Sequence, residues 1–114
     1  MALGVGMGAF GAHGLRGRLD AYSMSVYERA VFYHFLHALG IMIVAVLART
    51  NVISASGGRL VAILFLFGII VFSGSLYALA TSGVRAFGAI TPIGGLAFIA
   101  GWLLLAYNAA RAAR

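Results

Sequence analysis

Cysteine and lysine are both missing from this sequence of 114 residues, and the acidic residues number only two. Without cysteine the chain has no disulfide, no thiolate nucleophile and no thiolate metal ligand. Charged residues make up 9% of the chain and hydrophobic residues 63%, with a mean hydropathy of +1.06. A water-soluble domain needs more polar residues to cover its surface. The composition therefore indicates a protein that resides in a lipid bilayer.

The net charge is +6, and all of the positive side chains apart from histidine are arginines. The arginines lie between and beyond the apolar segments and do not gather into one stripe: Arg16, Arg18, Arg29, Arg49, Arg59, Arg85, Arg111 and Arg114. A basic chain can bind nucleic acid, but no recognisable reader module is present. Anchoring at lipid headgroups explains this distribution better, so we expect the lipid bilayer and not nucleic acid as a partner.

Long uncharged stretches predict the architecture. Residues 30–48, 60–80 and 86–107 are each long enough to cross a hydrocarbon core of about 30 Å at about 1.5 Å per residue. Residues 1–14 cover only about 20 Å, and we predict a short, membrane-inserted first helix there. No basic segment precedes this stretch, so a cleavable signal peptide is not expected. Strands of a membrane barrel would alternate over about 10 residues, and these stretches do not.

The expected fold is therefore all-α, a membrane-spanning four-helix bundle in one domain, residues 1–114. Short connections favour antiparallel neighbours and an up-down topology. The predicted helices cover about residues 1–14, 21–48, 59–81 and 86–110. The mixed apolar and polar residues 19–27 suit a short amphipathic helix at the interface, and we predict a polar loop at 49–59 and a tight turn at 82–85.

The arginine count says little about orientation, because four arginines fall on each side of the membrane. Arg29 lies at the membrane edge beside Glu28 and is expected to be partly neutralised by it. Since positive residues accumulate on the cytoplasmic side, this small asymmetry favours two cytoplasmic termini in the inner (plasma) membrane.

Small residues on two of the helices predict close helix packing. They are Gly4, Gly8 and Gly11 on the first span and Gly94, Gly95 and Gly101 on the last. Such residues let helix backbones approach each other in lipid, either inside the bundle or in a homo-oligomer. Pro92 should kink the last span or define its first turn.

Residues 6–11 match the letters of the dinucleotide-binding motif GxGxxG. That motif requires a preceding strand, and none is predicted here, so we expect no dinucleotide cofactor.

Histidines are the most informative polar residues. His34 and His37 are three positions apart on the second span, and Tyr33 is four before His37. His13 ends the first span and should approach the start of the second if the two are antiparallel. Ionisable residues in a span usually face the bundle interior or water. Three interpretations stay open: a structural polar cluster, a metal or haem site, and a proton relay or ligand pocket.

Hydroxyl groups interrupt the third and fourth spans at Ser73, Ser75, Tyr77 and Thr91. Hydroxyls in lipid tend to form hydrogen bonds between helices. No acid or base is clearly placed to activate either serine as a nucleophile. We therefore predict that these residues help to close one buried polar zone with Tyr33 and His37.

Several motifs occur in order along nearly the whole chain: GAFGAHGL at 8–15, Tyr-His-x-x-His at 33–37, FSGSLYALA at 72–80, TPIGG at 91–95 and GW at 101–102. This pattern resembles a family of small membrane proteins that includes YgdD-like and YwdK-like bacterial proteins and a related eukaryotic membrane protein. The matching residues are Gly8, Gly11, His13, Tyr33, His37, Ser73, Gly74, Ser75, Tyr77, Thr91, Pro92 and Gly94. The resemblance implies a compact four-helix inner-membrane protein and carries over no activity or cofactor.

The functional expectation is accordingly a non-enzymatic membrane protein, acting as an accessory or scaffold subunit or as a small homo-oligomer. The alternative is a membrane protein that handles a small ligand, protons or a metal through the His/Tyr/Ser cluster.

Overall fold

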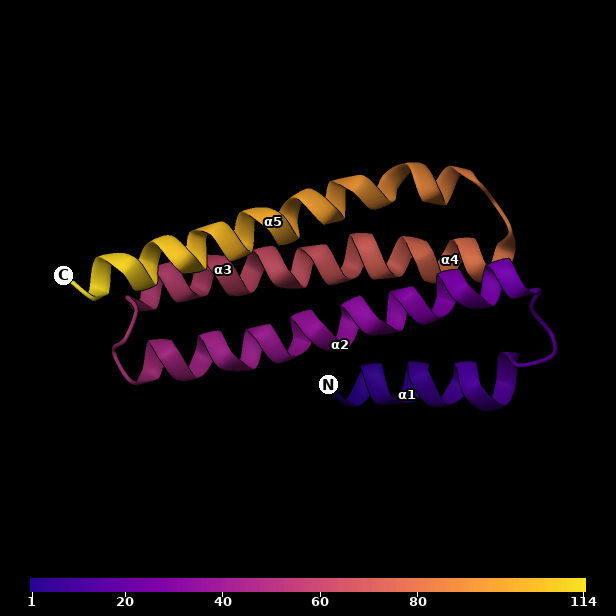
Figure 1. Ribbon diagram of the computed structural model, residues 1–114, viewed down its shortest axis with the longest axis horizontal. Coiled ribbons are helices and arrows are strands. Elements are labelled where there is room, and N and C mark those ends of the chain that lie inside the picture. Colours follow the sequence, from indigo (N-terminus) through magenta and orange to yellow (C-terminus); the bar gives the residue numbers. More distant parts are fainter.

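The computed structural model describes all 114 residues and is helical apart from short turns (Figure 1). Its segments are, in chain order, α1 (Ala2–Phe10), η1 (Gly11–Leu15), α2 (Ala21–Arg49), α3 (Ala55–Gly68), η2 (Ile69–Ser73), α4 (Gly74–Ser82) and α5 (Ala86–Ala112). The two η segments are single π-helical turns that continue the neighbouring α-helices. The chain thus forms four rods, of which α1–η1 is the shortest.

Successive rods run in opposite directions (Figure 1). The α3–η2–α4 rod lies between α2 and α5, and α1 packs against α2. The molecule measures 52 × 26 × 16 Å. This arrangement confirms the predicted all-α bundle with up-down topology and a short first helix.

Three helices are long and apolar enough to cross a membrane, as judged by length and composition: Ala21–Arg49, Ala55–Ser82 and Ala86–Ala112. Only 24 of the 114 residues are buried, and large apolar side chains are exposed along every rod, among them Leu3, Phe32, Ile70 and Leu103. Such a surface would be unstable in water. It is stable in hydrocarbon, which supports a location in the bilayer.

The second helix is one uninterrupted rod from Ala21 to Arg49, close to the predicted 21–48, so residues 21–27 form its first turns and not a helix of their own. Asp20 caps the N-terminus of α2, where its carboxylate accepts a hydrogen bond from the Ser23 backbone N–H at 2.7 Å. This bond satisfies one of the free N–H groups of the first turn. The hydrogen bonds from Ser23 also lower the pKa of the Asp20 carboxyl from its usual value.

The polar loop predicted at 49–59 is shorter in the structure, because α3 already begins at Ala55. The Ser54 hydroxyl accepts a hydrogen bond from the Gly57 N–H at 3.1 Å and caps the helix. This cap lets the glycines at 57 and 58 join the helix despite their low helical propensity. At the other end of the rod, Gly83 ends α4 in the left-handed conformation, with φ of 72°, which glycine adopts at little cost.

Apolar side chains form two separate cores. One lies at the end with the first and third loops and includes Tyr27, Leu76 and Ala80. The other includes Val44 from α2, Val61 and Phe65 from α3, and Phe98 from α5. The buried polar side chains His34, His37, Ser73 and Ser75 accompany these cores.

Candidate functional site

His37 is the centre of the most elaborate side-chain cluster. Its ring is 2% exposed and stacks on Phe98, with centroids 3.4 Å apart and planes inclined by 10°. Its Nδ1 lies 2.9 Å from the Tyr33 carbonyl oxygen, one turn earlier in α2. Its Nε2 lies 3.0 Å from the indole Nε1 of Trp102 on α5. His37 therefore joins two helices that are far apart in sequence.

These two contacts determine the protonation state of His37. A backbone carbonyl can only accept a hydrogen bond, so Nδ1 must carry the hydrogen. The Trp102 indole can only donate, so Nε2 must be unprotonated. The ring is thus neutral and both of its nitrogens are in use, which leaves neither free to bind a metal in this arrangement.

His34 contacts the third rod one turn before His37. Its Nδ1 and the Tyr77 hydroxyl are 3.1 Å apart, and either group can act as the donor. Tyr77 also packs against the Tyr27 ring, with centroids 5.1 Å apart. The Tyr27 hydroxyl donates to the Met7 carbonyl at 2.6 Å, so the contacts continue from α4 through α2 to α1.

Two serines connect the third rod to its neighbours. Ser73, with no exposed surface, donates from Oγ to the Ala30 carbonyl of α2 at 2.9 Å. Ser75 Oγ lies 2.6 Å from Thr91 Oγ1 of α5 and 3.0 Å from the Phe72 carbonyl. The structure therefore brings Ser75 to Thr91, whereas Tyr77 turns toward α2.

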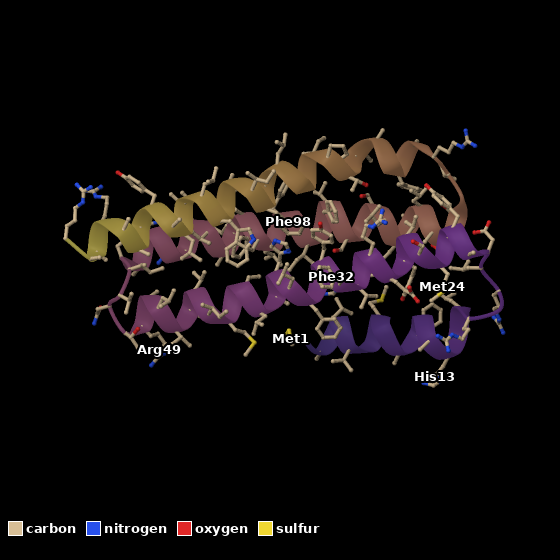
Figure 2. The ribbon with its side chains drawn as sticks, viewed as in Figure 1. Met1, His13, Met24, Phe32, Arg49 and Phe98 are labelled. Atoms are coloured by element: carbon tan, nitrogen blue, oxygen red, sulfur yellow. The ribbon has the colours of Figure 1, made fainter.

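His13 does not join this cluster. The sequence predicted that its ring faces the bundle interior, but the structure places it on the exposed side of η1 (Figure 2). The π-helical turn at Gly11–Leu15 instead buries Gly11 and Leu15. No group of three His, Cys, Asp or Glu residues lies close enough together to hold a metal ion. A metal site that pairs His13 with His34 or His37 is inconsistent with this geometry.

The glycines of the first span pack against α2. A Cβ at Gly4 or Gly8 would contact the Phe35 ring at 3.6 and 3.9 Å, which is ordinary packing distance. Gly11 is tighter, because a Cβ there would lie 2.5 Å from the Tyr27 ring. This glycine face is thus used inside the chain.

On α5, Gly94 makes the closest approach of two backbones. A Cβ at Gly94 would lie 2.4 Å from the Phe72 backbone nitrogen, and one at Gly101 would lie 2.6 Å from the Phe65 ring. At Gly95 the added atom would meet the Phe72 ring at 3.7 Å, with no clash. Pro92 lies inside α5, on its exposed side, and the helix continues through it.

Two parts of this site were not recognised from the sequence. Trp102 entered the sequence analysis only as part of the GW motif, although it supplies the hydrogen bond to His37. The π-helical turn Ile69–Ser73 has no simple sequence signature, yet it holds Phe72 and Ser73 where they contact α2 and α5. π-helical turns are rare and often occur at functional sites.

A lipid-facing groove of about 290 Å³ opens beside His37. Its walls are mostly aromatic, with Tyr33, Phe72, Phe98 and Trp102 contributing. A second groove, of about 380 Å³, lies between α1 and α2 and has two charged residues in its lining, Arg16 and Glu28.

An apolar exterior, three helices of membrane-spanning length and interhelical polar contacts define a small integral membrane protein. Residues 7–95 match the model of a family described as "Protein of unknown function (DUF423)". The chain belongs to this family.

Its relatives are membrane proteins by name. The chain is 53% identical to UPF0382 membrane protein SH2409 of Staphylococcus haemolyticus, over 90% of this chain and 82% of the relative. It is 44% identical to UPF0382 membrane protein YwdK of Bacillus subtilis, over 96% of this chain and 88% of the relative. These matches confirm the resemblance to YwdK-like proteins. No solved structure matches the chain.

Proposed function

We propose that this protein is a non-enzymatic component of the inner (plasma) membrane that acts through contacts with other membrane helices. It serves either as an accessory or scaffold subunit of a larger complex or as a small homo-oligomer. Both termini lie in the cytoplasm.

The observation that supports this proposal is that the buried polar side chains already have their hydrogen-bond partners inside the protein. Every buried side-chain nitrogen and oxygen has a hydrogen-bond partner within the chain. His37 uses both ring nitrogens, and Ser73 donates to a backbone carbonyl. A catalytic group must reach a substrate, whereas these groups hold α2, α4 and α5 in register.

The test is purification of the full chain in a mild detergent, followed by mass measurement of the complex. The proposal expects either a defined oligomer or a partner protein at constant stoichiometry. A monomer that co-purifies with no protein, even after crosslinking in the intact membrane, would contradict it.

A second candidate function is the handling of a small ligand in the groove beside His37. The groove presents the half-exposed Trp102 to the lipid phase among aromatic walls, and the nearly buried His37 is one of its lining residues. Trp102 is the single tryptophan of the chain, so its fluorescence reports on this groove alone. A ligand that changes Trp102 emission in wild type but not in His37→Leu would favour this candidate.

A further inference from the structure

We propose that the groove between α1 and α2 binds one phospholipid that carries a primary ammonium group, of the phosphatidylethanolamine type. The groove has a volume of about 380 Å³ and a mostly apolar lining, with Arg16 and Glu28 as its only charged residues. This proposal is independent of the polar cluster around His37.

Both charges lie in the half of the groove that is nearer the loop between η1 and α2. Arg16 follows η1 directly, and Glu28 lies on the first part of α2, which runs antiparallel to α1. Both side chains are exposed. A guanidinium group binds phosphate oxygens through paired N–H donors, and a carboxylate attracts an ammonium group. The pair thus matches a headgroup that carries both charges.

The depth of these charges also matches a headgroup. Glu28 and Arg29 are the last charged residues before the uncharged stretch 30–48 of α2, which is about 28 Å long and fills the hydrocarbon core. Glu28 therefore lies at the boundary between headgroups and acyl chains. A carboxylate deeper in the bilayer would be costly.

The remainder of the groove fits an acyl chain. Beyond Glu28 its α2 wall extends to Phe35, about 10 Å along the helix, which is about a third of a 30 Å hydrocarbon core. Met24 and Phe32 lie on the side of α2 that faces α1 (Figure 2). Gly8, Gly11 and Ala12 form the opposite wall.

Native mass spectrometry of the full chain in mild detergent tests the proposal, with phosphatidylethanolamine and phosphatidylglycerol added separately at equal concentration. We expect one phosphatidylethanolamine to stay bound at collision energies that remove phosphatidylglycerol. Arg16→Gln should weaken the binding of both lipids roughly tenfold, the effect of losing a hydrogen bond to a charged group. Glu28→Gln should abolish only the preference for phosphatidylethanolamine.

Arg29→Gln is the matched control, because Arg29 lies at the same depth and does not line the groove; it should behave as wild type. Ala12→Phe fills the groove without changing a charge and should displace both lipids. Equal retention of the two lipids by wild type would overturn the proposal, since it would indicate ordinary surrounding lipid. The same conclusion follows if Arg16→Gln and Glu28→Gln resemble Arg29→Gln. If the charge variants fail to fold, the lipid preference of wild type and the Ala12→Phe result still decide the question.

Discussion

The Trp102 indole on α5 donates a hydrogen bond to His37 Nε2 on α2 at 3.0 Å, across 65 positions of sequence. The His37 ring is held at the same time between this donor and the Tyr33 carbonyl, and it stacks on Phe98. The first and last long helices are therefore joined directly, although the α3–η2–α4 rod lies between them for most of their length.

Removing either partner of this bond should destabilise the protein. In Trp102→Phe the His37 Nε2 loses its donor, and in His37→Leu the indole N–H loses its acceptor. Membrane hydrogen bonds average about 0.6 kcal/mol and reach about 1.7 kcal/mol, so we expect a coupling energy within that range. A double-mutant cycle of thermal stability in detergent measures it. Strict additivity of the two substitutions would show that the bond contributes nothing.

The serine contacts should behave as separate pairs. Ser75→Ala and Thr91→Val each remove one side of the same bond, so their effects, about 0.6 kcal/mol each, should not add. Ser73 contacts Ala30 on a different helix, and Ser73→Ala should add to Thr91→Val. The thermal midpoints of the single and double variants decide this. Coupling between Ser73 and Thr91 would instead indicate one shared network with His37.

Gly94→Ala should loosen the contact between α5 and η2. The added Cβ would lie 2.4 Å from the Phe72 backbone nitrogen, and backbone cannot move aside as a flexible side chain can. Overpacking of this kind costs about 1–3 kcal/mol. The matched control is Gly74→Ala, because Gly74 is helical and a Cβ there meets nothing within 4 Å. The control should be neutral or slightly stabilising; equal melting temperatures for the two variants would contradict the observed packing.

Asp20 should make the stability of the protein depend on acidic pH. The hydrogen bonds from Ser23 lower the pKa of its carboxyl in the folded state. A lowered folded-state pKa means that the contribution is complete above the unfolded-state pKa and is lost as the pH falls through the folded-state pKa. Asp20→Asn keeps a capping oxygen without the charge. Melting curves from pH 7 to pH 3 should fall less steeply for Asp20→Asn than for wild type, and parallel curves would refute this role.

Reporter fusions test the proposed orientation. A reporter that is active only in the cytoplasm, fused after Arg114, should be active, and one that needs export should be silent. The charge asymmetry that favours this result is small, and Arg29→Gln, which removes a positive charge from the side opposite the termini, should strengthen the preference. Activity of the exported reporter after Arg114 would reverse the orientation.

The sequence alone was enough to predict that this protein resides in a lipid bilayer and in which order its helices follow. Composition and the lengths of the uncharged stretches predicted an all-α membrane bundle, and His37, Ser73 and Thr91 were recognised as polar residues in need of partners. These properties are local, because the cost of burying charge or leaving hydrogen bonds unmade in hydrocarbon acts on each segment separately.

Only the tertiary structure decided which partner each polar residue takes. His13 and His37 are both histidines next to or within an apolar stretch, so the sequence does not distinguish their surroundings. In the structure His13 lies on the exposed side of the π-helical turn, whereas His37 on α2 is buried against Trp102. Rotation of a helix about its axis is set by packing with its neighbours, such as Gly94 against Phe72, and not by hydrophobicity, since lipid and apolar side chains are nearly equivalent solvents. Pairs such as Tyr77 with His34 and Ser75 with Thr91 follow from these rotations, which no single segment of the sequence specifies.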